Sequence, residues 1–245
     1  MAGQFHGAIR RKKVAVIYNG IPPDDLAPPP ENRLQEFKRR HRITGNPVIG
    51  VVGRINLEQK GQDVFVRAAA ALADKFPEAG FVVAGSPYPG NEEHGRRLDR
   101  LIDDLKLRGR VASTGDVSDL TCLHSSLDVC VLPARKPEGL GNVLIEAMAL
   151  GKPVVGAAIG GIPEIIEDGV NGYLVEPGNV SSLARALERL LADPAQRRRM
   201  GDAGKRRFQE LFEFDECYTS LLALYSALQV QSGGAPAADL VETAR

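Results

Sequence analysis

The 245-residue sequence lacks any apolar run that approaches the roughly 20 residues a membrane-spanning helix requires. No apolar stretch follows the charged residues 1–13 either, so they do not have the pattern of a signal peptide. Neither sign of charge is in excess, because 31 Lys and Arg balance 31 Asp and Glu, and this balance does not indicate nucleic-acid binding. The 43% apolar and 25% charged residues are typical of a globular protein, which we expect in the cytoplasm.

Cysteine and histidine are also scarce. The three cysteines are odd in number and lack metal-ligand spacing, and Cys130 lies in an apolar run that predicts a buried free thiol. The four histidines are scattered without a ligand pattern, so we expect surface or structural roles for His6, His41, His94 and His124. The sequence therefore predicts neither a metal site nor a catalytic triad.

Three nucleotide-binding motifs are missing. No G-x-G-x-x-G opens the first usable strand-to-helix turn, so we do not expect a nicotinamide cofactor. Lys60-Gly61-Gln62 has neither the glycine before it nor the hydroxyl after it that a phosphate-binding P-loop requires. No Asp-x-Asp pair is present to hold a divalent ion against a pyrophosphate. The charge of any bound diphosphate would then be met by Arg54, Lys60 and backbone N–H groups.

Short apolar runs alternate with amphipathic patterns along the chain, which is typical of a parallel sheet wrapped by helices. Runs that are apolar throughout, such as 48–52, indicate strands buried on both faces. The predicted strands are 14–18, 48–52, 81–84, 111–114, 129–132, 153–156 and 172–175. The predicted helices are 62–76, 96–107, 120–125, 142–150, 163–167, 180–191, 194–211 and 214–229.

The pattern predicts one α/β domain over residues 14–228, a Rossmann-like doubly wound parallel sheet with extra C-terminal helices. The proline-rich stretch 21–32 is predicted to be a loop or linker. The small, polar residues 229–245 are predicted to be a disordered tail.

Polar and glycine-rich residues follow four of the predicted strands, at 53–61, 85–87, 115–117 and 133–142. Ligands bind at the carboxyl ends of the strands in such a sheet, because the N-termini of helices converge there. We therefore expect these segments to form one binding site.

Two glutamates bracket the start of the helix that follows the last of these segments. If that helix begins near Asn142, the first amides, at 141–143, are unpaired donors suited to phosphate oxygens. Glu146, one turn inside, can accept hydrogen bonds from a ribose diol, and Glu138 in the loop can reach hydroxyls beyond the phosphates. Glycines at 139 and 141 allow the backbone to approach a ligand closely.

Each of these residues also has a plainer interpretation when it is taken alone. The two glutamates could be surface residues, Arg54 and Lys60 could be solvated, Val117 could pack a loop, and the glycines could form ordinary turns. The functional hypothesis depends on all of them following successive strands.

The segment 138–155, EGLGNVLIEAMALGKPVV, closely resembles the signature of family-four retaining glycosyltransferases with the GT-B fold. Further segments at 16–21, 53–61, 160–164 and 168–175 resemble other parts of that family in the same order. The similarity covers residues 14–228. The resemblance implies transfer of a sugar from a nucleoside diphosphate sugar to an acceptor, with retention at the anomeric carbon and without a cofactor or metal.

The resemblance also implies roles for individual residues. Arg54 and Lys60 would contact the donor diphosphate and stabilise the departing nucleotide, and Glu138 would bind the transferred sugar. The backbone near Val117 would hold the base, and Glu146 the ribose. The full set of donor-binding residues would be Gly53, Val117, Gly139, Leu140, Gly141, Asn142, Val143 and Glu146.

A complete enzyme of this kind has two Rossmann-like domains, so the resemblance implies an acceptor-binding N-terminal domain, in cis or as a separate subunit. Residues 1–13 would be the end of that domain or a linker. We expect a UDP-sugar rather than a GDP-sugar donor, and a role in glycan, glycolipid or exopolysaccharide synthesis. A nucleotide-sugar-binding module without catalysis is the alternative. The basic segment 197–207 could touch anionic lipid peripherally or be a solvated helix face.

Overall fold

The computed structural model describes residues 15–22 and 26–232 and contains a six-stranded parallel sheet with the strand order β3-β2-β1-β4-β5-β6. Every residue of β1, β2, β4 and β5 is buried, which explains why these segments are continuous apolar runs. The strands are β1 Val48–Val52, β2 Gly80–Ala84, β3 Val111–Gly115, β4 Val129–Leu132, β5 Val154–Ala157 and β6 Gly172–Val175. The predicted doubly wound α/β class is therefore confirmed.

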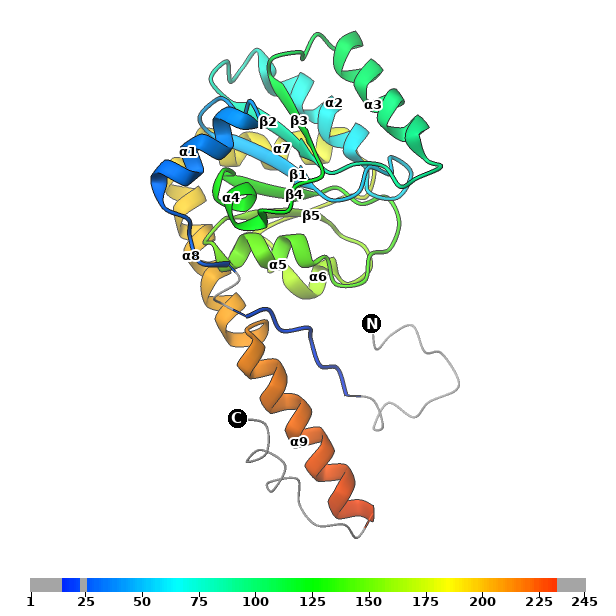
Figure 1. Cartoon of the computed structure of the whole chain (residues 1–245), viewed down its shortest axis with the longest axis vertical. Coiled ribbons are helices and arrows are strands. Elements are labelled where there is room, and N and C mark those ends of the chain that lie inside the picture. Colours follow the sequence, from blue (N-terminus) through cyan, green and yellow to red (C-terminus); the bar gives the residue numbers. More distant parts are fainter. Residues whose placement is uncertain (1–14, 23–25, 233–245) are drawn as a thin grey trace.

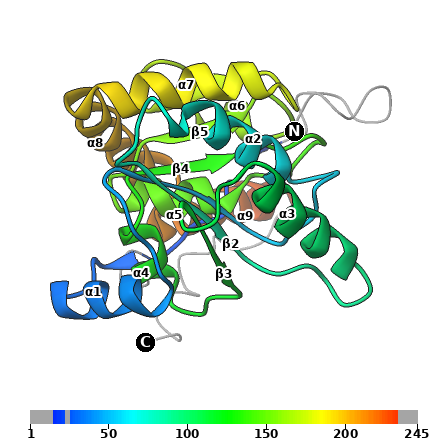
Figure 2. The same cartoon turned by 90° about the horizontal axis from the view of Figure 1, so that it is seen from above.

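Helices cover both faces of the sheet (Figures 1 and 2). On β1, Ile49 and Val51 belong to the core shared with α2, α3 and α7, whereas Val48 and Val52 face a core shared with α1 and α4. Helix α5 packs against α8 on this second face. The helices are α1 Glu31–Arg40, α2 Gln62–Ala73, α3 Glu92–Asp104, α4 Leu120–Ser125, α5 Asn142–Ala149, α6 Ile162–Ile165, α7 Val180–Ala192, α8 Pro194–Leu211 and α9 Phe214–Ser232.

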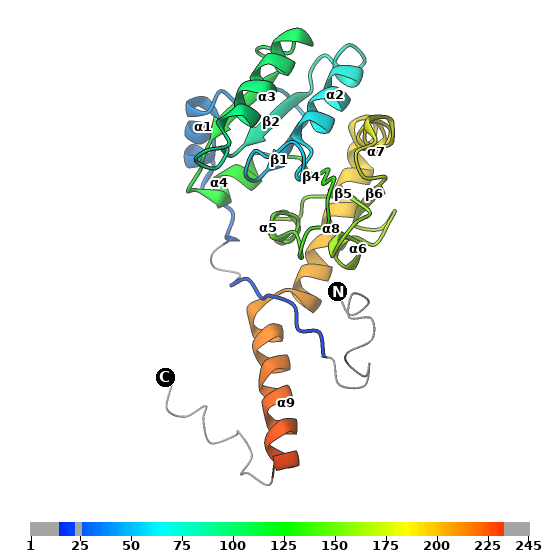
Figure 3. The ribbon, with the colours of Figure 1, turned by 90° about the vertical axis from the view of Figure 1, so that its right-hand side faces the viewer.

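Helix α9 projects away from the sheet and its covering helices (Figures 1 and 3). In the described residues, no helix is both long and apolar enough to span a bilayer. Residues 229–232 complete α9, so the prediction of a disordered tail was wrong for them, and the rest of that segment lies outside the described residues. Residues 1–13 also lie outside them.

The predicted strand at 14–18 was wrong: Val14 lies outside the described residues, and 15–18 form no strand. The ring of Tyr18 packs 5.2 Å from that of Phe212, centroid to centroid, and its hydroxyl donates to Glu164 at 3.0 Å. Tyr18 therefore packs against α6 and the end of α8, whereas Ala15 and Val16 are exposed. Burial, with the hydrogen bond to Glu164, raises the pKa of Tyr18.

Helix α1 was not predicted, and it begins at the end of the expected loop 21–32. Its sequence, ENRLQEFKRR, is mostly charged, and Phe37 is its buried residue. Only Leu34 and Phe37 are apolar among its ten residues, so the helix has few of the core-facing residues from which the other helices were predicted. The prediction for Cys130 was correct, since it is a buried free thiol.

Candidate functional site

The loops after β1 and β4 meet at the carboxyl edge of the sheet. These two strands pair directly, although almost 80 residues separate them. The chain turns from β1 into α2 on one face of the sheet, and from β4 into α5 on the other. Such a divergence of neighbouring connections opens a crevice at the strand ends, where ligands bind in open α/β sheets.

Lys60 and Glu138 form an ion pair across this crevice. The ammonium Nζ of Lys60 donates to Oε2 of Glu138 at 2.8 Å, and the two side chains are 26% and 10% exposed. The second carboxylate oxygen, Oε1, is buried and has no partner among the described residues. A buried acceptor without a donor is costly, so Oε1 is available to a hydroxyl of a bound ligand.

The pair lies on the wall of a cavity of about 500 Å³. Helix α5 begins at this cavity after Gly141, which has φ +79° and provides no side-chain cap. The first amides of α5 are therefore donors directed at the cavity, where the helix dipole also favours an anion. The lining residues are Val16, Ile17, Tyr18, Asn19, Lys60, Leu132, Glu138, Gly139, Leu140, Gly141, Asn142 and Val143.

The loop after β5 supports the Glu138 loop through backbone contacts. The N–H of Gly161 donates to the carbonyl oxygen of Glu138 at 3.1 Å. A Cβ atom on Gly160 would lie 2.3 Å from the Glu138 carbonyl oxygen, and one on Gly161 would lie 2.0 Å from the Gly139 carbonyl oxygen. Only residues without a side chain allow this approach. The two glycines therefore let the loop after β5 pack directly against the backbone of Glu138 and Gly139.

The β1–α2 loop is held by Gln62, a residue that the sequence did not single out for this role. Gln62 is 1% exposed, and its amide Nε2 donates to the carbonyl oxygen of Arg54 at 2.8 Å. Its Oε1 accepts from the backbone N–H of Asn56 at 3.3 Å. One feature of the sequence could have indicated this role. Gln62 is a polar residue at the first position of a helix whose other core-facing residues are apolar.

We expect Gln62→Leu to lower the free energy of unfolding by about 1–3 kcal/mol, because the carbonyl of Arg54 and the N–H of Asn56 would lose their partners. Urea denaturation measures this change. Gln59→Leu is the matched control, because no side-chain hydrogen bond is assigned to Gln59 in the described structure, and it should stay within about 0.5 kcal/mol. Equal losses in the two variants would contradict the role given to Gln62.

Gly53 and Arg54 follow β1 but lie beside the cavity rather than in its wall. Gly53 has φ +136°, in the region that favours glycine. Arg54 is exposed, and its guanidinium carbon lies 3.6 Å from the ring centroid of Tyr88, in the loop after β2. Arg54 is therefore held by a cation–π contact next to the site.

Val117 and Glu146 lie further along the same edge. Val117 packs, like Val143, against an apolar cluster that includes the strand-end residues Val52 and Ala84. Glu146 does not line the cavity; its Oε2 lies 2.9 Å from Nε2 of His124, which is fully buried. The structure thus gathers Lys60, Glu138 and residues 139–143 around one cavity, with Gly53, Arg54, Val117 and Glu146 beside it. Their roles toward a ligand stay predictions.

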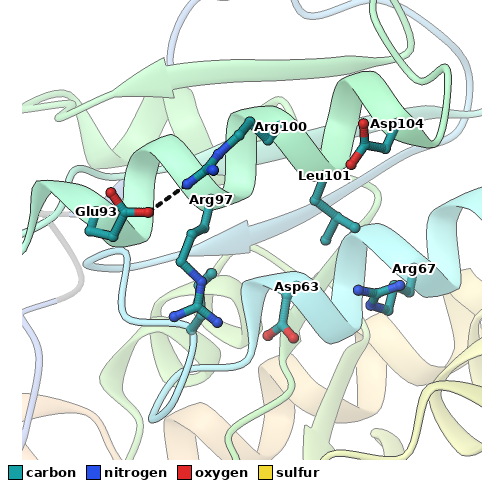
Figure 4. A pocket seen from close by; sticks show the side chains of 8 residues that line it. Asp63, Arg67, Glu93, Arg97, Arg100, Leu101 and Asp104 are labelled. Atoms are coloured by element: carbon teal, nitrogen blue, oxygen red, sulfur yellow. Dashed lines mark hydrogen bonds and ion pairs between the residues drawn. The ribbon is translucent and has the colours of Figure 1, made fainter.

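A second cavity, of about 480 Å³, lies between α2 and α3, and none of its lining residues lines the cavity beside Lys60 and Glu138 (Figure 4). Its charges are largely paired within the protein: Arg100 contacts Glu93 at 2.5 Å, and Asp63 contacts Arg135 at 2.6 Å. Three arginines and three acidic residues line it, so it has no excess charge to attract an ion. We therefore assign the site to the crevice after β1 and β4.

The family model described as "Glycosyl transferases group 1" matches residues 33–207, which is more than half of the chain. The chain belongs to the group 1 glycosyltransferase family. This match confirms the resemblance seen in the signature segment 138–155.

Individual relatives agree with this membership. A GDP-mannose-dependent alpha-(1-6)-phosphatidylinositol monomannoside mannosyltransferase of Mycolicibacterium smegmatis is 33% identical over 195 residues, covering 76% of this chain and 49% of the relative. A D-inositol 3-phosphate glycosyltransferase of Salinispora tropica is 38% identical over 186 residues, covering 73% and 38%. The chain therefore spans about half the length, or less, of these curated relatives.

Solved structures confirm the GT-B type of architecture. Anabaena HepE in complex with UDP and glucose superposes with a TM-score of 0.81 and 26% identity, over 89% of this chain and 58% of that one. The C-terminal domain of a glycosyl transferase group 1 family protein (LpcC) from Francisella tularensis gives a TM-score of 0.71 and 30% identity, over 79% of this chain and 99% of that one. The group 1 chain described here thus corresponds to nearly all of that C-terminal domain.

Proposed function

We propose that this chain is the donor-binding half of a retaining glycosyltransferase that moves a sugar from a nucleoside diphosphate sugar to an acceptor. The observation that carries the proposal is the Lys60–Glu138 pair beside the open N-terminus of α5. A cation and helix amides suit a diphosphate, and a carboxylate oxygen without a partner suits the hydroxyls of the attached sugar.

The chemistry follows from where charge develops. When the bond between the sugar and the diphosphate breaks, negative charge builds on the leaving phosphate. Lys60, the amides of α5 and the neighbouring Arg54 would stabilise this charge, so the proposed reaction uses protein cations and needs no metal. Glu138 would orient the transferred sugar, and Glu146 would accept hydrogen bonds from the ribose.

We propose UDP as the donor nucleotide and glycolipid, glycan or exopolysaccharide synthesis as the setting. The complex of HepE with UDP and glucose supports this base, whereas the mycobacterial relative is named for GDP-mannose. Relatives named for phosphatidylinositol monomannoside and inositol 3-phosphate support a polyol or glycolipid acceptor.

We also propose that an acceptor-binding domain, in cis or as a separate subunit, packs against α9. One face of α9 exposes apolar and aromatic side chains at alternating intervals of four and three residues, each 37–54% exposed. Such a continuous apolar stripe on a projecting helix is typical of a contact surface. The stripe consists of Phe214, Tyr218, Leu221, Tyr225 and Leu228.

Calorimetric titration of the purified chain with uridine, UDP, GDP and ADP, and with UDP-glucose and GDP-mannose, tests the donor assignment. We expect UDP to bind at least about tenfold more tightly than uridine, because the phosphates supply charge-assisted hydrogen bonds. Absence of binding by every nucleotide would contradict the proposal, and preference for GDP would correct the base.

Incubation with labelled donors, with and without an acceptor-binding partner domain, separates a transferase from a binding module. Turnover only with the partner would support the split-site transferase. Donor binding without turnover in every combination would favour the alternative, a nucleotide-sugar-binding module without catalysis.

A further inference from the structure

His124 connects two helices at the edge of the proposed donor site. It lies in α4, is 0% exposed, and contacts Glu146 of α5, 22 residues further along the chain, at 2.9 Å. It was expected to have a surface or structural role, and no periodic pattern joins it to Glu146. A buried polar side chain that contacts a candidate ribose ligand calls for a physical account.

The surroundings of the ring determine which nitrogen carries the proton. Nδ1 of His124 is buried and has no partner among the described residues. An Nδ1–H tautomer would leave a buried donor unpaired and turn the lone pair of Nε2 toward a carboxylate oxygen. With the proton on Nε2, the ring has no unpaired buried donor at Nδ1, and Nε2–H donates to Oε2 of Glu146.

This contact fixes one oxygen of Glu146 and leaves the other free. Oε2 accepts from His124, while Oε1 has no assigned partner in the part of the chain that the structure describes. The side chain is 17% exposed, so it is anchored on one side and solvent-accessible on the other. Burial, and then the negative charge of Glu146, raises the pKa of Cys130, so this thiol stays neutral beside the carboxylate.

We propose that His124 is a positioning residue that orients Glu146 toward the ribose hydroxyls of the donor nucleotide. This inference rests on the proposed function, because it takes Glu146 to be the ribose ligand. A glutamate that is already ordered loses less conformational entropy when the ribose binds. The effect should therefore appear in affinity for nucleotides with intact ribose and be absent when the hydroxyls are removed.

The test compares His124→Met with His124→Gln. The two side chains have the same length, but only glutamine has an N–H that can reach the place of Nε2. Calorimetry measures dissociation constants for UDP, GDP and ADP and for their 2′,3′-dideoxy counterparts, in wild type, both variants and Glu146→Ala. We expect His124→Met to weaken the ribonucleotide about five- to tenfold, to leave the dideoxynucleotide unchanged, and to be rescued by His124→Gln.

Two results would overturn the role of His124 while the site stands: equal weakening of both nucleotides by His124→Met, or no weakening of either. Equal weakening of both by Glu146→Ala would instead remove Glu146 from the ribose, and the inference with it. Thermal unfolding confirms that each variant folds. Should His124→Met not fold, His124→Asn replaces it, since its shorter amide ends near the place of Nδ1 and cannot reach Glu146.

Discussion

Lys60→Met is expected to weaken the binding of a nucleoside diphosphate by about ten- to a hundredfold while leaving the affinity for the parent nucleoside unchanged. Methionine keeps most of the aliphatic stem of Lys60 but removes the ammonium group, which points into the crevice at Glu138. A hydrogen bond to a charged group contributes about 1.5–3 kcal/mol, which corresponds to roughly that loss. Titration with UDP and uridine in parallel measures the difference.

The same substitution should also lower the free energy of unfolding, by about 1–3 kcal/mol, because neither carboxylate oxygen of Glu138 would keep an assigned partner. The double variant Lys60→Met/Glu138→Gln removes the uncompensated charge, so it should regain stability but not diphosphate affinity. Stability and binding can thus be separated at this pair.

Lys75→Met is the control for the loss of a lysine–glutamate contact. Lys75 pairs with Glu188 at the surface, where both side chains are well exposed. An exposed pair contributes at most about 1 kcal/mol, and neither Lys75 nor Glu188 lines the cavity at the strand ends. Equal loss of uridine and UDP affinity in Lys60→Met would contradict the phosphate assignment.

The sheet could be predicted because its strands obey a simple physical rule. A strand buried on both faces must be apolar throughout, and β1 at 48–52 and β4 at 129–132 lie where the apolar runs placed them. The same rule failed at 15–18, where Ala15 and Val16 are exposed and Tyr18 packs against Phe212 instead of joining the sheet. Helix α1 was not predicted because it contributes little to the core: Phe37 is its one buried residue.

The site was predictable only in outline. Strand-end positions and a family signature identified Lys60 and Glu138, but their contact depends on the pairing of β1 with β4, which no local pattern reveals. The contacts of Gln62 and His124 were not predicted, because each is a hydrogen bond to a distant side chain or to the backbone. Such contacts are properties of the packed chain and have no sequence spacing of their own.

Gly160→Ala is expected to lower the free energy of unfolding by about 1–3 kcal/mol more than Gly151→Ala, and to reduce the affinity for a nucleotide-sugar more than for the free nucleotide. Gly160 and Gly151 have nearly the same backbone conformation, with φ +65° and +67°, so alanine adds similar left-handed strain at each. A Cβ atom on Gly151 meets nothing within 4 Å, whereas one on Gly160 would lie 2.3 Å from the Glu138 carbonyl oxygen and 2.6 Å from its nitrogen.

The difference between the two variants therefore isolates the contact with the Glu138 loop. Because the clashing atoms are backbone atoms, no change of rotamer relieves the clash, and one of the two loops must move. Displacing the Glu138 carboxylate would remove the group proposed to bind the transferred sugar, while Lys60 and the amides of α5 could still bind the phosphates. Urea denaturation and titration with UDP and UDP-glucose measure the two effects. Equal unfolding free energies for Gly160→Ala and Gly151→Ala would contradict this account. They would show that the Glu138 loop can move without loss of stability, so that the glycines at 160–161 do not determine its position.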